Sequence, residues 1–285
     1  MKQGSRRRNR RLERKRRILI RLMVRVCMVL VVILVVLAFV KRKKLFDGDG
    51  SNQMPEGPVL EPVSVKDFLE LPAGTVVDIA QLDKERLSEY FSVNEIGDDV
   101  FQRINGKSYV ENENIGIDEL RYLKMPHYNY DHRIQIGEMI VNAGIAEDVR
   151  NIFLELFDQD YEIAAMYLVE EYWTGDGEST DKNSIENNNT SAFNYRTIPG
   201  LSDLSNHALG YAVDVNPLQN PYVAYNEDGS FRETYKDMER YIDRSAAEAH
   251  MIGQGDICYQ TFTKYGFTWG GDWEGVKDYQ HFEKR

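Results

Sequence analysis

Two histidines and two carboxylates near the C-terminus are the residues of this sequence with the clearest potential for chemistry. Asp214 follows His207 by seven residues, and Asp278 precedes His281 by three. Two histidines and one carboxylate can hold a zinc ion, and three protein ligands leave the fourth coordination position open for water, as in hydrolytic sites. The spare carboxylate can then accept a proton as water attacks. The chain has only two cysteines, so a four-cysteine structural site is excluded.

The local sequence predicts how the first two ligands are presented. Gly210 and the two nearby valines argue against a helix, so residues 207–210 are predicted to form a turn that leads into a strand over 211–215. Alternate residues of a strand share a face, which places Ala212 and Asp214 together and buries Val213 and Val215 on the other side. The small alanine leaves room for an ion beside the carboxylate.

Arg196 is the best candidate to stabilise a developing oxyanion or to hold a substrate carboxylate. In so acidic a region it could equally form a structural ion pair. The histidine–acid spacings carry little weight alone, because 46 of the 285 residues are acidic. Their conjunction with the surrounding serine, glycine, alanine and tryptophan residues is more specific.

These surroundings resemble the zinc-dependent peptidoglycan peptidases, which include D-Ala-D-Ala carboxypeptidases and L-alanyl-D-glutamate peptidases. The family pattern S-x-H-x-x-G-x-A-x-D matches residues 205–214 without a gap. The later pattern W-G-G-D-W, followed by acid-x-x-H-F, matches residues 269–273 and 278–282. The resemblance runs from about residue 190 to the C-terminus. It implies a Hedgehog-like zinc peptidase fold, with a small antiparallel sheet flanked by helices.

The resemblance also implies roles for individual residues. His207, Asp214 and His281 would bind one zinc ion, and Asp278 would be the general base. The substrate-binding candidates are Ser205, Trp269 and Trp273, although either tryptophan could instead belong to the core. Asp272 could orient a ligating histidine or cap a turn. His127 and His132 are predicted to be packing or surface residues, and His250 is assigned no chemistry.

The expected activity is hydrolysis of peptidoglycan stem peptides. The carboxypeptidase branch usually carries glutamate at the position of Asp278, whereas the L-alanyl-D-glutamate branch often carries aspartate. This difference favours an L-alanyl-D-glutamate endopeptidase over a D-alanyl-D-alanine carboxypeptidase. A second alternative is a non-catalytic, zinc-stabilised binding module, since the signalling domain of Hedgehog proteins has a similar fold. Such a module would not need the carboxylate of Asp278.

Charge divides the chain into two parts. Residues 1–44 carry a net charge of +15 and the remainder −26, for a total of −11. The acidic part would repel phosphates, so nucleic-acid binding is not expected. The basic part surrounds an apolar run that predicts one transmembrane helix, with the N-terminus cytoplasmic and the rest extracytoplasmic in a bacterial membrane. A cleaved signal peptide is the alternative, weakened by the absence of a small-x-small cleavage site.

The predicted organisation therefore has five parts. They are a basic cytoplasmic tail (1–17), a transmembrane anchor with stop-transfer residues (18–44), a flexible linker (45–62), an N-terminal extension of unknown role (63–116) and a zinc peptidase domain (117–285). The fold class is α+β. Hydrophobic patterns predict helices over 138–157 and 245–253, buried strands over 163–169 and 211–215, and a polar loop over 174–189.

Overall fold

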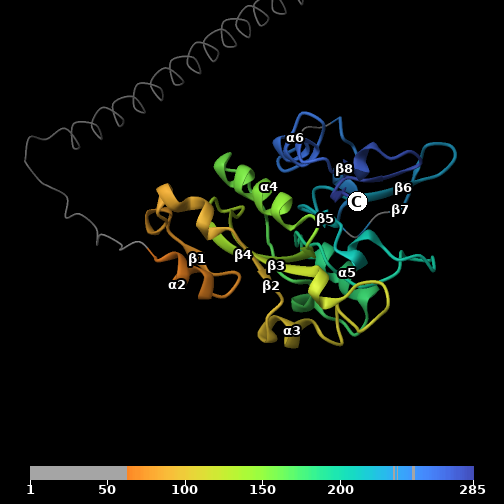
Figure 1. The fold of residues 1–285 in the computed structure, drawn as a ribbon. Coiled ribbons are helices and arrows are strands. Elements are labelled where there is room, and N and C mark those ends of the chain that lie inside the picture. Colours follow the sequence, from red (N-terminus) through yellow and green to blue (C-terminus); the bar gives the residue numbers. More distant parts are fainter. Residues whose placement is uncertain (1–62, 234, 236, 246–247) are drawn as a thin grey trace, which may run out of the picture. The chain divides into compact units, whose positions relative to one another are not determined.

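The computed structural model describes residues 63–233, 235, 237–245 and 248–285. The predicted tail, anchor and linker lie outside these residues. In the part of the chain that is described, no helix is long and apolar enough to cross a membrane. The elements are short helices and antiparallel strands, which confirms the α+β class (Figure 1).

The largest sheet has four antiparallel strands in the order β1-β4-β3-β2. Its centre is a hairpin of β3 (Leu120–Tyr128) and β4 (Ile134–Asn142), paired along nine residues of each strand. β1 (Val76–Val77) and β2 (Ser92–Glu95) pair with its two sides. The predicted helix over 138–157 is therefore wrong at its start. Almost every β4 residue is buried, and a strand buried on both faces lacks the alternation that distinguishes it from a helix.

Helix α4 (Ala146–Asp158) forms the remainder of that predicted helix. Its buried residues Val149, Ile152, Phe153 and Leu156 follow the i, i+3, i+4, i+7 spacing of one helix face. The helix packs against β3 and β2 and also contacts α6 (Ile257–Lys264) (Figure 1). The main core thus joins the large sheet to the C-terminal part of the domain.

The extension over residues 63–116 is built into this sheet. It supplies β1 and β2 together with α2 (Val65–Glu70), η1 (Ile79–Gln81), η2 (Lys84–Tyr90) and α3 (Asp98–Ile104). Phe68 and Tyr90 are fully buried in the main core with their rings in edge contact, 4.9 Å between centroids. A second, smaller core lies around α3 and contains Val100, Ile104, Tyr109, Ile115, Leu120, Ile140, Leu168 and Phe193.

Three segments differ from their predictions. The polar stretch 174–189 contains helix α5 (Gly177–Glu186), whose N-cap Asp176 accepts a hydrogen bond from the Ser179 amide. Residues 163–169 are mostly buried but make only an isolated bridge, Ala165 to Asn189, before η4 (Val169–Tyr172). The described residues of 245–253 form turns and irregular structure, and His250 has a left-handed backbone (φ 66°) that an α-helix does not allow.

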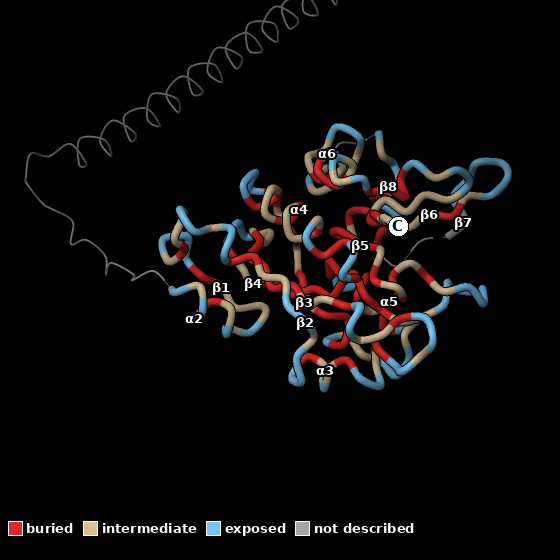
Figure 2. Tube along the Cα trace, viewed as in Figure 1, coloured by how far each residue is buried: buried red, intermediate tan, exposed pale blue. Residues whose placement is uncertain are grey.

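Two small antiparallel sheets complete the described chain. One has the order β5-β10-β8, from β5 (Ala212–Asp214), β10 (His281–Glu283) and β8 (Thr268–Trp269). The other has the order β7-β6-β9, from β7 (Phe231–Glu233), β6 (Tyr222–Tyr225) and β9 (Val276–Asp278). Connecting turns include η3 (Ile117–Glu119), η5 (Asn206–Leu209), η6 (Glu239–Tyr241) and η7 (Gly270–Asp272). Strands β3, β4 and β5 are mostly buried (Figure 2).

Candidate metal centre

A tight turn presents His207. Residues 206–209 form η5, and Ser205 caps it by accepting a hydrogen bond from the His207 amide (3.3 Å). Gly210 ends the turn in the left-handed region (φ 72°), where a Cβ would also lie 2.5 Å from the amide nitrogen of Asn142. That amide donates to the Gly210 carbonyl (2.9 Å), which fixes the turn to the end of β4. The predicted turn is confirmed.

The other two members lie on facing strands. Asp214 is directly opposite His281 in the antiparallel pair of β5 and β10, so both side chains project from the same face. Val213 and Val215 are fully buried in the main core on the other face, as the alternation predicts. A three-residue strand pair therefore aligns two residues that are 67 positions apart in the chain.

Three side-chain atoms converge on one point. His207 Nε2 lies 3.2 Å from His281 Nδ1 and 3.3 Å from Asp214 Oδ1, and the last two are 3.1 Å apart. Ligands about 2.0–2.1 Å from a tetrahedral zinc ion are separated by roughly 3.3 Å, so this triangle fits zinc. All three residues are buried, and no other group of histidine, cysteine, aspartate and glutamate side chains in the described chain meets the spacing for a metal ion.

The charges in this triangle also suit a cation. Burial opposes ionisation of Asp214, but the charges and hydrogen bonds of His207 and His281 outweigh it and lower the pKa of the carboxyl far below its usual range. Burial would likewise lower the pKa of His281, yet its contacts with Asp214 and Glu283 raise it to about 10. In the metal-free protein a proton on His281 therefore supplies the positive charge, and a metal ion must displace it.

Neighbouring groups fix the orientation of each triangle member. His207 Nδ1 donates to the carbonyl of Ala192 (2.6 Å), which directs the lone pair of Nε2 inward. The amide of Gln280 donates to Asp214 Oδ2 (3.2 Å), leaving Oδ1 for the triangle. The outer nitrogen of His281 contacts Glu283 Oε2 (3.2 Å). The sequence patterns did not reveal these contacts, although Glu283 lies two residues after His281 on a strand and therefore shares its face.

Asp272, considered from the sequence as an orienting residue, does not contact the triangle. It is exposed and accepts a hydrogen bond from Gln254 (3.0 Å). The sequence also allowed a role for Asp272 in a turn. This alternative describes it better, because Asp272 is the last residue of η7.

Asp278 lies at the end of β9, in the sheet next to the one that carries His281. Its Oδ1 atom is buried without a hydrogen-bond partner among the described residues. Burial, together with the negative charge of Asp214, raises the pKa of its carboxyl to about 7. Gly270 allows Asp278 and His281 to pack closely on either side of it. A Cβ at this position would lie 2.5 Å from the Asp278 carbonyl oxygen and 3.2 Å from the His281 Cβ.

Arg196 forms a nearly buried ion pair with Asp181 of α5, Nη2 to Oδ2 2.6 Å, with 11% and 10% of the two side chains exposed. Its Nε is buried without a hydrogen-bond partner in the described chain. Burial would lower the pKa of the guanidinium, but the charges of Asp181 and of Asp214 raise it. Arg196 is thus electrostatically linked to the triangle, while its charge is already paired.

The three predicted substrate-binding residues have different surroundings. Trp269 is buried against Phe282, and its indole nitrogen donates to the Tyr279 carbonyl (2.8 Å). These contacts favour the core alternative that the sequence left open for this tryptophan. Trp273 is half-buried with its ring 5.2 Å from that of His281. The Ser205 hydroxyl is buried in the cap of the His207 turn.

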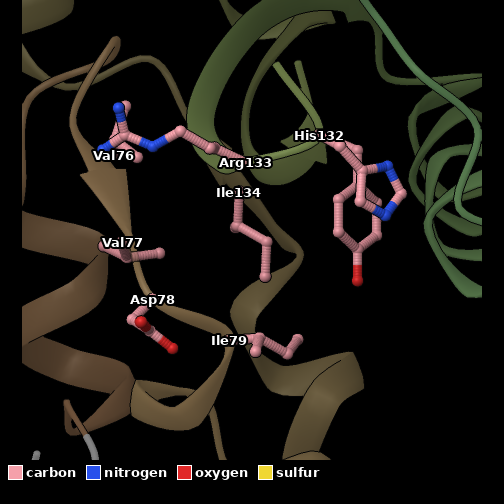
Figure 3. A pocket seen from close by; sticks show the side chains of 8 residues that line it. Val76, Val77, Asp78, Ile79, His132, Arg133 and Ile134 are labelled. Atoms are coloured by element: carbon pink, nitrogen blue, oxygen red, sulfur yellow. The ribbon is translucent and has the colours of Figure 1, made fainter. Parts of the chain in front are cut away.

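A separate pocket lies between β1 and the β3–β4 turn (Figure 3). None of its lining residues belongs to the metal triangle. They are Val76, Val77, Asp78, Ile79, Tyr128, His132, Arg133 and Ile134.

Residues 200–284 match the family model described as D-alanyl-D-alanine carboxypeptidase. The predicted resemblance to this zinc peptidase family is confirmed. The matched segment is under a third of the chain and contains His207, Asp214, Asp278 and His281 but not Arg196. No curated protein and no solved structure gives a significant match. The match supports a peptide hydrolase of the carboxypeptidase type, from a family that depends on zinc and acts on peptidoglycan peptides.

Proposed function

We propose that this protein is a membrane-anchored, extracytoplasmic zinc peptidase that hydrolyses the stem peptides of bacterial peptidoglycan. The observation that carries the proposal is the triangle of His207, Asp214 and His281, whose sides of 3.1–3.3 Å suit a zinc ion. These three residues would hold the metal. When bound, zinc supplies a Lewis acid that polarises a peptide carbonyl and makes water acidic near neutral pH.

Asp278 is assigned the proton transfer. Its buried Oδ1 has no competing hydrogen bond among the described residues, and its pKa of about 7 lets the carboxyl take up and release a proton near neutral pH. Asp214 has the opposite surroundings and stays ionised. Two carboxylates in one site with separated pKa values are the usual division between a proton carrier and a charge stabiliser. Arg196, whose charge is paired with Asp181, is assigned to stabilise the developing oxyanion and not to hold a substrate carboxylate.

The bond that we propose is the one between L-alanine and D-glutamate. In addition to the aspartate at position 278, the pairing of Arg196 supports an endopeptidase. A carboxypeptidase holds the terminal carboxylate of its substrate, and a cation suits that task when its charge is free. Arg196 is already paired with Asp181 at 2.6 Å. The description of the matched family favours the second candidate, a D-alanyl-D-alanine carboxypeptidase.

The membrane anchor is proposed from the sequence of residues 18–44, with its basic flanks and apolar centre. Residues 1–17 would then remain in the cytoplasm, and residues 45–62 would connect the anchor to the peptidase on the outer side. Fusion of a reporter that is active on only one side of the membrane, placed after residue 285, tests this topology. Reporter activity on the cytoplasmic side would contradict it.

The activity is tested with the full chain purified in detergent and loaded with zinc. It is incubated with a tripeptide-stem and a pentapeptide-stem muropeptide, and the products are identified by mass spectrometry with and without a chelator. Cleavage after L-alanine in both stems is the expected result. Loss of only the terminal D-alanine from the pentapeptide would instead support the carboxypeptidase. A zinc-bound protein without any chelator-sensitive product would favour a binding module.

A further inference from the structure

Glu283 is the charged residue that touches the metal triangle from outside. It lies two positions after His281 on β10, and its Oε2 is 3.2 Å from His281 Nε2. His281 turns its other nitrogen, Nδ1, toward Asp214 and His207. The two nitrogens lie on opposite sides of an imidazole ring, so a carboxylate at Nε2 faces away from the metal position. Glu283 is therefore neither a fourth ligand nor a proton acceptor at the reacting atoms.

The same carboxylate oxygen also accepts a hydrogen bond from the side-chain amide of Asn206. Asn206 is the residue immediately before His207 and the first residue of η5. Glu283 consequently connects the strand that carries one histidine to the turn that carries the other. About a quarter of its side chain is exposed, 26%, so the pair is only partly screened by water.

We propose that Glu283, held by Asn206, is a positioning residue that fixes His281 for zinc. A carboxylate that accepts the Nε2 proton sets the tautomer with its lone pair on Nδ1, orients the ring and makes Nδ1 a stronger donor to a metal. His207 obtains the same tautomer control from a backbone carbonyl, that of Ala192 at 2.6 Å. The two histidines thus differ in the group behind them, and only the one behind His281 can be removed by substitution.

The test measures the zinc dissociation constant of the full chain by competition with a chromogenic chelator. Glu283→Ala is expected to weaken zinc binding about 10- to 100-fold. Glu283→Gln should lose less, because the amide oxygen still accepts the ring proton but carries no charge. Asn206→Ala should weaken binding in the same direction by a smaller factor. The matched control is Asp272→Asn, an exposed carboxylate eleven residues earlier that contacts no member of the triangle, and it should bind zinc as the parent chain does.

Zinc binding by Glu283→Ala within twofold of the parent chain would overturn the proposal. If Glu283→Ala fails to fold, the role of Glu283 is tested by the zinc affinity of Glu283→Gln and by histidine ¹⁵N–¹H spectra of the zinc-loaded parent chain. A proton on His281 Nε2 is expected, and an unprotonated Nε2 would overturn the role of Glu283.

The proposal rests on the zinc site of the proposed function, but the two can fail separately. A chain that binds zinc in a Glu283-dependent manner yet cleaves no stem peptide would refute the peptidase and keep the positioning role. If the parent chain cleaves stem peptides and Glu283→Ala retains full zinc affinity, the positioning role is refuted and the peptidase is kept. A parent chain that does not bind zinc would refute both.

Discussion

The four-stranded sheet and the metal centre use burial in different ways. The sheet is held by long strands, nine residues in β3 and in β4, whose buried residues are mostly apolar. Around the metal centre the strands are only three residues long, and many of the buried residues are polar. There His207, Asp214 and His281 are each positioned by specific hydrogen bonds, so single contacts matter more than summed apolar area.

Histidine shows the difference most directly. His127 is buried on β3 with both ring nitrogens unpartnered among the described residues, and burial alone lowers its pKa to about 3. His281 is equally buried, but its contacts with Asp214 and Glu283 raise its pKa to about 10. One environment excludes charge and the other requires it. Burial of a histidine is therefore no guide to function until its partners are known.

The strongest contrast should come from removing one histidine from each region. His281→Ala is expected to abolish both zinc binding and peptide hydrolysis, because only two ligands remain. His127→Leu should keep both, and its stability should not fall, since the substitution removes a buried polar group without a partner. Metal content, hydrolysis rate and thermal unfolding of the two variants measure this. Loss of zinc from His127→Leu, or retention of zinc by His281→Ala, would contradict the placement of the zinc site at His281.

Within the metal centre, Asp278 should separate binding from turnover. Asp278→Asn keeps the shape of the side chain but cannot accept a proton, so the hydrolysis rate is expected to fall about 10²- to 10⁴-fold. Zinc content should remain that of the parent chain, because Asp278 is not a member of the triangle. Rates on the tripeptide stem, together with metal analysis, provide the measurement. Undiminished activity would remove Asp278 from the mechanism.

In the sheet region, the corresponding experiment changes packing. Phe153 is buried on α4, and its ring meets that of Phe262 edge-on at 6.3 Å. Phe153→Ala should lower the free energy of unfolding by about 3–5 kcal/mol, the usual effect of a large cavity in a core. The folded fraction should still bind zinc with the parent affinity. Denaturant unfolding and chelator competition measure the two quantities, and a loss of under 1 kcal/mol would contradict the packing described for α4.

The last prediction concerns the effect of pH on the metal-free protein. The pKa of His281, about 10, lies above its ordinary value of 6.5. A raised pKa stabilises the folded state fully below pH 6.5, and this contribution is lost as the pH rises toward 10. Zinc binding has the opposite trend, because it displaces the proton and should strengthen with rising pH. Thermal melts with chelator and zinc titrations between pH 6 and 9 would reveal these opposed slopes.

Sequence patterns predicted the metal centre better than the framework that surrounds it. The turn at Gly210 and the alternation of β5 follow from local rules, and the structure brings His207, Asp214 and His281 together. Glu283 could have been found from the period of a strand. The contact between His207 and the Ala192 carbonyl could not have been predicted, because every residue has a backbone carbonyl and no residue type marks the one that His207 contacts.

Predictions failed mainly where tertiary contacts decide the local structure. β4 has apolar residues on both faces and resembles a buried helix in sequence. α5 is a polar stretch whose helix depends on the Asp176 cap and on burial of Thr180, Asp181, Ser184 and Ile185. Arg196 was proposed from the sequence as a candidate for oxyanion or carboxylate binding, and that role stays a prediction. Its ion-pair partner Asp181 could not be predicted, since it lies in a segment predicted to be a loop.

The position of β1 and β2 has a practical consequence. Both strands come from residues 63–116, and they cover the two edges of the β3–β4 hairpin. A protein truncated to residues 117–285, the boundary that the motifs alone suggest, would expose unpaired backbone amides and carbonyls along both edges. Uncovered edges of this kind recruit strands from other molecules, and the truncated chain should aggregate. We therefore expect the extension to keep the hairpin soluble and to be needed in any functional fragment.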